Sequence, residues 1–219
     1  MTSPSTRSPS RYGAEDSPTE WFLAHKRQIS WAVLALAVVI GGFWYFQRSR
    51  SLKEQHAERA YFQARQSANA GNLPLAVSDL KKVVTRYEGT RGGTQAVIFL
   101  AQSLYEQKNH KEGVAELKKA LSGAPADFVP SIHALVANGH EELKEFGPAA
   151  EEYKAAAAAT EFPAEKARYQ AAAARAYMAA GKPEEAKAIW TELAKDDTGP
   201  LAAEARVRLG EITAKPMSM

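Results

Sequence analysis

The segments AGNLPLAVSDLKKVV (residues 70–84), QKNHKEGVAELKKAL (107–121), KEFGPAAEEYKAAAA (144–158) and AGKPEEAKAIWTELA (180–194) share one pattern, and this pattern decides the fold. In each segment a small residue is followed four positions later by an apolar residue, and three positions further by a small or apolar one. Spacings of four and seven keep side chains on one face of an α-helix. We therefore expect four amphipathic helices with these inward residues: Ala76, Leu80, Val83; Gly113, Leu117, Ala120; Ala149, Tyr153, Ala156; Ala186, Trp190, Leu193.

The first small residues, at positions 76, 113, 149 and 186, recur at intervals of 37, 36 and 37 residues. A tetratricopeptide repeat has a period of about 34 residues and consists of two helices, and a longer loop between repeats accounts for the surplus. The preceding segments carry matching small and apolar residues, as in Leu100-Ala101 with Leu104. The sequence thus predicts an all-α, tetratricopeptide-type helical solenoid of about four helix hairpins over residues 51–214.

Turn-forming residues separate the two helices of each expected hairpin. We place these turns at Gly71-Asn72, Asn109, Gly147-Pro148 and Gly181-Lys182-Pro183, and we interpret Gly92-Gly93 as a turn between repeats. Pro200 precedes a last amphipathic segment, LAAEARVRLGEI, which would cover the apolar edge of the final repeat as a capping helix. Residues 215–219 are expected to form a flexible C-terminus.

A second feature precedes the repeats. Residues 29–46, ISWAVLALAVVIGGFWYF, contain no charged side chain. At about 1.5 Å per residue a helix of this length covers the hydrocarbon core of a bilayer, roughly 30 Å thick, with little to spare. Aromatic and basic residues flank both ends, as is typical of membrane interfaces. We predict a transmembrane anchor over residues 21–50, preceded by a disordered tail rich in Ser, Thr and Pro over residues 1–20.

Two alternatives to a membrane anchor fit this sequence less well. A buried helix of a soluble core would normally show a polar stripe, and this run has none. A cleaved signal peptide would need small residues at a cleavage site, whereas FQRSRS follows the apolar run, so an uncleaved signal anchor fits better. Four basic residues precede the span and four follow it closely, so the charge distribution leaves the orientation open.

Composition excludes several classes of function. The formal net charge is +3, but the excess lies in the first fifty residues, since 22 basic and 22 acidic residues follow. A neutral repeat domain lacks the positive field that a phosphate backbone requires, so we expect no nucleic-acid partner. The chain has no cysteine, which excludes disulfides and thiolate metal sites. No nucleophile with its base, metal cluster or phosphate loop is recognisable, so we expect neither an enzyme nor a cofactor nor a small-molecule substrate.

His133 and His140 are seven residues apart and share one face of a predicted helix. Two helical turns separate them by roughly 10 Å, which is too far for one metal ion. We interpret them as partly buried structural histidines and predict no metal.

The chain resembles a known bacterial family in several motifs. These are an aromatic cluster ending the span (GGFWYFQRSR), an AxxAYxxA-like segment (Ala57, Ala60, Tyr61, Ala64), and repeats that finish in DxxxPLAAEARVRL. Over residues 20–214 it is similar to the YfgM-like family, the ancillary subunit of the Sec translocon. The resemblance implies a cytoplasmic N-terminus, a periplasmic repeat domain, and association with the SecYEG channel and periplasmic chaperones. The longer Ser/Pro-rich tail departs from the family pattern.

Groove-facing positions follow from aligning the first helices of the four hairpins, because these helices line the concave surface of such a solenoid. The alignment gives sixteen positions, four on each first helix: Glu58, Tyr61, Arg65, Ala68; Gln95, Ile98, Gln102, Tyr105; Ser131, Ala134, Asn138, Glu141; Arg168, Ala171, Arg175, Met178. Polar and aromatic side chains mix there, which suits an extended peptide or a partner helix. The predicted contacts are Tyr61, Arg65, Gln102, Tyr105, Asn138, Glu141, Arg175 and Met178. Ordinary solvated helix residues remain the alternative interpretation of these side chains.

The sequence therefore predicts a protein-binding adaptor held in the bacterial inner membrane by a single span. Its partners would be translocon subunits, periplasmic chaperones or exported clients, and Gly41 and Gly42 would contact translocon helices within the bilayer. The alternative is a structural scaffold of another envelope complex, such as the division or outer-membrane assembly machinery, without a role in translocation.

Overall fold

The computed structural model describes residues 18–196 and 198–214, so residues 1–17 of the predicted tail and the predicted C-terminal segment 215–219 lie outside this range. Residues 18–20, which were predicted to belong to the disordered tail, are helical and begin α1. Every regular element within the described residues is helical, so the all-α prediction is confirmed. The chain forms α1 (Pro18–Asn69), α2 (Leu73–Arg86), α3 (Arg91–Glu106), α4 (His110–Ala120), a 3-10 helix η1 (Ala126–Phe128), α5 (Val129–Glu142), α6 (Phe146–Ala159), α7 (Pro163–Ala179), α8 (Pro183–Lys195) and α9 (Ala202–Thr213).

The chain divides into two compact units, residues 1–50 and 51–219, and the boundary falls within α1. In the first unit large apolar side chains between Trp31 and Phe46 are more than half exposed. The segment Lys26–Asn69 contains a window with a mean hydropathy of 2.0, and none of that window is buried in the structure. This helix is long and apolar enough to cross a membrane, and its exposure argues against the alternative of a buried core helix.

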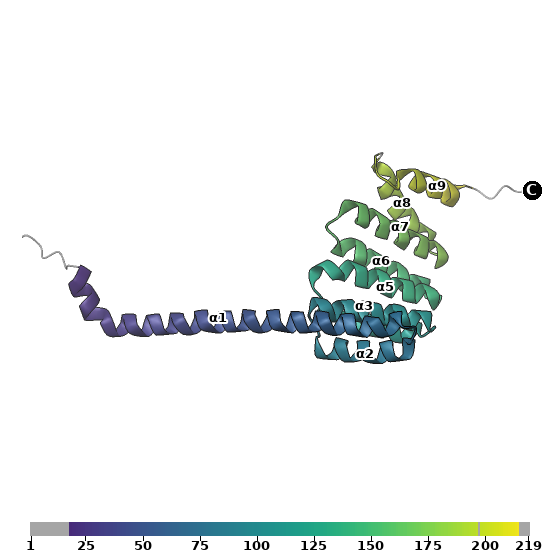
Figure 1. Cartoon of the computed structure of the whole chain (residues 1–219). Coiled ribbons are helices and arrows are strands. Elements are labelled where there is room, and N and C mark those ends of the chain that lie inside the picture. Colours follow the sequence, from purple (N-terminus) through teal and green to yellow (C-terminus); the bar gives the residue numbers. More distant parts are fainter. Residues whose placement is uncertain (1–17, 197, 215–219) are drawn as a thin grey trace, which may run out of the picture. The chain divides into compact units, whose positions relative to one another are not determined.

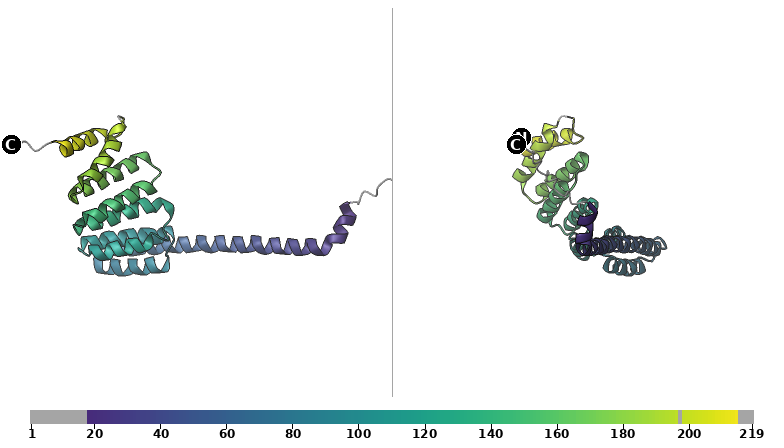
Figure 2. Two further views of the ribbon diagram at one scale, coloured as in Figure 1. Left: turned by 180° about the vertical axis from the view of Figure 1, so that it is seen from behind. Right: turned by 90° about the vertical axis from the view of Figure 1, so that its left-hand side faces the viewer.

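The second unit is a stack of helix hairpins. Figure 1 shows α2, α3 and then α5 to α9 following one another along the stack, and the left view of Figure 2 shows the same succession from behind. The first helices of the hairpins are residues 51–69 of α1, then α3, α5 and α7, and the second helices are α2, α4, α6 and α8. Neighbouring helices pack against one another along the chain, and α9 packs on α8. The predicted solenoid with a C-terminal capping helix is thus present.

Small inward residues let these helices approach closely. Eleven of the twelve residues predicted to face inward are buried, and Ala120 is half-buried. Leu80, Leu100 and Leu104 centre the first core cluster, and Ile132 and Val136 belong to the next. The C-terminal cluster is built largely of alanines around three aromatic residues, Tyr153, Tyr177 and Trp190. Burial of the larger side chains contributes roughly 1.5–3 kcal/mol each to stability.

The same backbone turn ends the first helix of each of the four hairpins. Gly71, Lys108, Lys144 and Gly181 have φ angles of 79°, 64°, 61° and 72°, and they recur at the repeat intervals of 37, 36 and 37 residues. The amide after each donates to a carbonyl five residues upstream, as in Asn72 N to Ser67 O at 3.1 Å and Lys182 N to Tyr177 O at 2.9 Å. These are Schellman turns, which satisfy the last carbonyls of the helix. The prediction of a turn at Gly147-Pro148 was wrong in position. The chain turns at Lys144, and Gly147 and Pro148 lie in the first turn of α6.

The interpretation of Gly92-Gly93 as an inter-repeat turn was wrong. Both glycines are buried in the first turn of α3, and the loop before them turns at Gly89, which has a φ of 75°. A Cβ on Gly92 would lie 2.7 Å from the backbone of Ala57 on α1, and one on Gly93 would lie 2.1 Å from the carbonyl oxygen of Tyr87. These glycines let two backbone segments approach closely. The prediction had instead assumed that paired glycines mark a turn of the chain.

Two polar side chains, Thr90 and Glu54, bind the N-terminal amide groups of α3. Thr90 caps the helix, since its Oγ1 accepts a hydrogen bond from Gly93 N at 3.0 Å. The Glu54 carboxylate of α1 accepts from Arg91 N at 3.0 and 3.1 Å. A carboxylate at a helix N-terminus interacts favourably with the helix dipole, so Glu54 ties α1 to α3.

Candidate protein-binding surface

The eight predicted groove residues lie on the first helices of the four hairpins, within the second unit. Arg65, Gln102, Asn138, Arg175 and Met178 are exposed, whereas Tyr61, Tyr105 and Glu141 are half-buried. Asn138 and Arg175 line one cleft near the C-terminal end of the stack, and Arg175 and Met178 line a second. Both clefts are therefore lined in part by predicted groove residues.

The first cleft, with a volume of about 300 Å³, lies between α5 and α7 and is called the α5–α7 cleft below. At its base Tyr153 Oη lies 2.5 Å from Asn138 Oδ1 and 3.0 Å from Glu141 Oε2, and these two acceptors share its single proton. Burial raises the pKa of the Tyr153 hydroxyl, and the Glu141 charge raises it further. The phenol thus stays protonated and holds both α5 side chains in place. The cleft is lined by Ala134, Asn138, Tyr153, Arg168, Tyr169, Ala172, Arg175 and Leu201.

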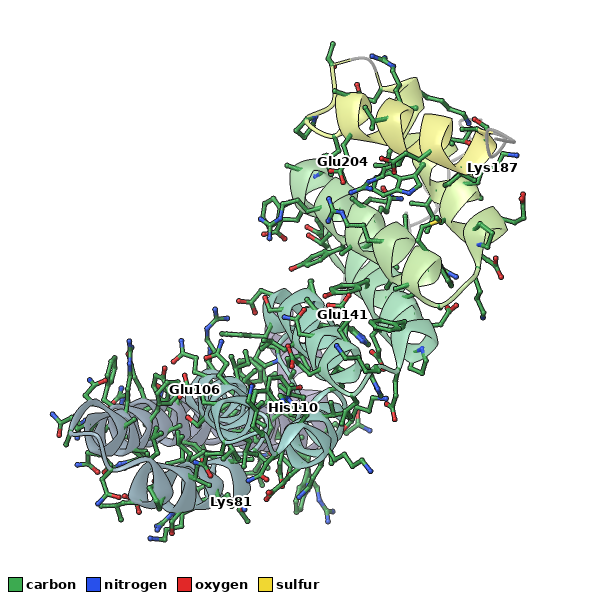
Figure 3. The ribbon with its side chains drawn as sticks, turned by 90° about the vertical axis from the view of Figure 1, so that its right-hand side faces the viewer. Lys81, Glu106, His110, Glu141, Lys187 and Glu204 are labelled. Carbon is green, nitrogen blue, oxygen red and sulfur yellow. The ribbon has the colours of Figure 1, made fainter. Side chains whose placement is uncertain are left out.

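An ion-pair chain borders this cleft on its C-terminal side. Arg175 donates to both carboxylate oxygens of Glu204 on α9, with Nη2 at 2.8 Å from each. Arg208 Nε lies 3.8 Å from Glu204, and Arg208 Nη1 lies 2.9 Å from Glu211. Figure 3 shows Glu204 and Lys187 on opposite sides of the C-terminal helices. The bidentate pair fixes the Arg175 guanidinium between the two clefts.

The second cleft, about 240 Å³, lies between α7, α8 and α9. Met178, Trp190 and Ile212 supply its apolar lining, with Arg175, Arg208 and Glu211 around them. Trp190 is completely buried, and its Nε1 has no hydrogen-bond partner within the described residues. A cleft of this size and character can receive one large apolar side chain.

The Tyr105 side chain is held between two hairpins and is not free to contact a partner protein. Its Oη donates to the carbonyl oxygen of Leu135 on α5 at 3.0 Å, and burial raises the pKa of this hydroxyl. A Cβ on Gly113 or on Gly139 would lie within 2.4 Å of the tyrosine ring or hydroxyl. Tyr105 therefore fills the space that these two glycines leave and joins the second hairpin to the third.

The N-terminal members of the predicted groove are less enclosed. The Tyr61 ring packs against the first core cluster, and its centroid lies 5.6 Å from that of the exposed Phe62. Arg65 and Gln102 are exposed side chains on α1 and α3. The structure does not bring these three residues to either of the two clefts.

Both predicted structural histidines are engaged with carboxylates. His133 Nδ1 lies 2.7 Å from Glu152, which also pairs with Lys118 of α4 at 3.2 Å. His140 is buried, and its Nδ1 lies 2.6 Å from Glu145 at the start of α6. Across residues 18–196 and 198–214, no group of three or more potential metal ligands comes together. Both histidines thus connect α5 to α6 within the third hairpin.

A family model described as a tetratricopeptide repeat-like domain matches residues 19–136, more than half of the chain. The chain belongs to this family. The matched segment begins in α1 and ends in α5. It thus includes the apolar helix and the first two hairpins of the tetratricopeptide-like solenoid. No curated protein matches the chain.

Solved structures show the same tetratricopeptide-like fold. A Podosopora anserina protein described as a kinesin light chain with nearly identical TPR-like repeats is 17% identical, with 73% of this chain and 86% of that chain covered and a TM-score of 0.55. A tetratricopeptide repeat protein from Parabacteroides merdae is 17% identical over 72% and 60%, with a TM-score of 0.56. BtubC (BKLC) from P. vanneervenii is 17% identical over 94% and 89%, with a TM-score of 0.51. At these identities the likeness shows the fold alone.

The tetratricopeptide-like fold is generally a scaffold for protein interactions, and it suggests a protein-binding adaptor here. Alignment of the first helices missed several side chains that shape the clefts. Tyr153 and Trp190 belong to second helices, while Leu201, Arg208 and Ile212 belong to the capping segment. The sequence indicated only that these residues belong to inward helix faces or to the capping segment. It did not indicate that a residue packed in this way also borders a cleft.

Proposed function

We propose that this protein is a membrane-anchored adaptor of the bacterial inner membrane, in which residues 21–50 form the anchor and residues 51–214 bind proteins. The observation that carries the proposal is the combination in one chain of an exposed apolar helix with a solenoid that has two clefts at predicted groove positions. The proposed contacts are Tyr61, Arg65, Gln102, Asn138, Glu141, Arg175 and Met178, with Tyr105 supporting the groove from within.

Tethering makes weak contacts sufficient. A domain held at the membrane by its own helix experiences a high effective concentration of any partner fixed in the same bilayer. An open groove with exposed polar residues can then bind emerging chains transiently and release them. The finer proposal, which rests on the resemblance to the YfgM-like family, places this adaptor beside the Sec translocon, with the repeat domain in the periplasm among chaperones and exported clients.

The first expected result concerns the side of the membrane on which the repeat domain lies. A reporter that is active only in the periplasm, fused after Met219 of the full chain, should be active, and a reporter active only in the cytoplasm should be silent. The two fusions serve as controls for each other, provided that immunoblots show equal amounts of both in the membrane fraction. The reverse pattern would contradict the translocon assignment and leave a membrane-tethered adaptor that faces the cytoplasm.

Replacement of Gly41 and Gly42 by leucine should lower copurification of the channel several-fold from detergent-solubilised membranes. A Cβ at either glycine would meet no atom within 4 Å, so the substitutions leave the chain's own packing intact. Small residues let helices approach closely in lipid, and leucine would block that approach. The matched control replaces Leu36 and Ile40, which lie on the opposite face of the same helix, by phenylalanine and should leave recovery of the channel unchanged.

Recovery of the channel unchanged by G41L/G42L would refute the proposed helix contact. Recovery of a different envelope complex by the unaltered chain, with no translocon subunit, would favour the alternative of a scaffold for that complex.

A further inference from the structure

The charged side chains that line the α5–α7 cleft are basic, and acidic side chains lie only at its base and rim. Two arginines, Arg168 and Arg175, line it, and no carboxylate does. Arg175 is already bound by Glu204, whereas Arg168 is exposed and forms no hydrogen bond or ion pair within the described part of the chain. Within residues 18–196 and 198–214, the charge of Arg168 is therefore not matched by an ion pair.

Further donors converge on the same space. Because Asn138 Oδ1 accepts the hydrogen bond from Tyr153, the amide Nδ2 of Asn138 is left as a donor without a described acceptor. The Tyr169 hydroxyl lies beside Ser131, and burial raises its pKa, so it remains a neutral hydroxyl. A guanidinium, an amide N–H and a hydroxyl around one cleft form an arrangement suited to a carboxylate.

Acidic residues lie at the rim and limit which anion can enter. Glu141 is held by Tyr153, Glu204 by Arg175 and Arg208, and Glu165 by Thr160. Figure 3 labels Glu141 on α5 and Glu204 on α9. A highly charged ligand would be repelled by this rim, whereas a single carboxylate flanked by apolar groups would reach Arg168 and keep contact with Ala134, Ala172 and Leu201.

We propose that the α5–α7 cleft binds a glutamate or aspartate side chain within an extended, apolar segment of a partner protein. Arg168 pairs with the carboxylate, Asn138 donates to the same group or to the neighbouring peptide carbonyl, and Leu201 contacts the adjacent apolar side chain. The second cleft, around Met178 and Ile212, receives the next large apolar side chain. This inference rests on the proposed function, because it names the chemistry of the segment that the groove would bind.

Peptide binding to the full chain in detergent micelles, followed by fluorescence anisotropy, tests this assignment. The probe is a labelled, acetylated and amidated apolar peptide that contains a single Gly-Glu-Leu sequence, and its neutral counterpart replaces this one Glu by Gln. We expect the acidic peptide to bind roughly tenfold more tightly, the effect of one charge-assisted hydrogen-bonded pair. Arg168→Gln should abolish this preference. Lys166→Gln is the matched control, since it removes the same charge from an exposed residue of α7 that does not line the cleft.

Each outcome decides between the proposals. Equal binding of both peptides, or an acidic preference that survives Arg168→Gln, would overturn the carboxylate site while leaving a protein-binding groove intact. Binding only of a neutral peptide with a free C-terminal carboxylate would overturn the assignment to an internal segment. Absence of binding by all peptides would overturn the inference, and the copurification experiment would then judge the proposed function separately.

Discussion

Replacing Gly93 by alanine is expected to lower the free energy of unfolding of the repeat domain by about 3 kcal/mol. The added Cβ would lie 2.1 Å from the Tyr87 carbonyl oxygen and 2.8 Å from its carbonyl carbon. That carbonyl cannot move freely, because it accepts hydrogen bonds from Thr90 N at 3.1 Å and from Thr90 Oγ1 at 2.6 Å. Relief of the clash would therefore break the capping turn that starts α3.

Gly147→Ala is the matched control for this substitution. Gly147 also lies in the first turn of a helix, α6, but a Cβ there would meet nothing within 4 Å. Alanine has the higher helix propensity, so we expect no loss and a gain of up to about 1 kcal/mol. Urea unfolding followed by circular dichroism measures both variants. A Gly93→Ala variant as stable as the Gly147→Ala variant would show that the loop at Tyr87 yields readily.

The contrast between these glycines shows what the sequence could and could not predict. The helical period and the small-residue pattern were sufficient for the fold, because the inward positions of a helix follow from spacing alone. They located Leu80, Leu117 and Trp190 in the core correctly. Whether a glycine serves a turn or a close approach depends on which backbone lies opposite, and Tyr87 and Ala57 oppose Gly93 and Gly92 only in the folded chain.

The candidate surface was predictable to a smaller extent. The register of first helices placed Asn138, Arg168 and Arg175 beside one cleft, as a repeat alignment can. It did not anticipate that Tyr105 would bond to the Leu135 carbonyl or that Glu204 would bind Arg175. Both contacts join separate hairpins or the capping helix, and the stacking of successive repeats that creates them is not encoded in the periodicity of any single helix.

The second large effect is expected at Trp190, whose replacement by alanine should cost about 4 kcal/mol of local stability. The indole is completely buried among Tyr177, Leu193 and Ala205, and its removal would leave a cavity where α7, α8 and α9 meet. Because each repeat of a solenoid contacts only its neighbours, this loss should stay at the C-terminal end. Hydrogen exchange should therefore accelerate strongly in α8 and α9 and remain nearly unchanged in α3.

Trp190→Phe separates the volume of the ring from its polar group. The indole Nε1 has no partner within the described residues, so phenylalanine removes no protein hydrogen bond and leaves only a smaller cavity. We expect a cost of about 1–2 kcal/mol, well below that of alanine. Equal costs for phenylalanine and alanine would indicate that the indole N–H is bound after all, and uniform acceleration of exchange through α3 would contradict the independence of the repeats. Because Met178 and Ile212 border the second cleft with Trp190, the alanine variant should also weaken binding of the Gly-Glu-Leu peptide, which would connect the stability of the cap to the groove that it completes.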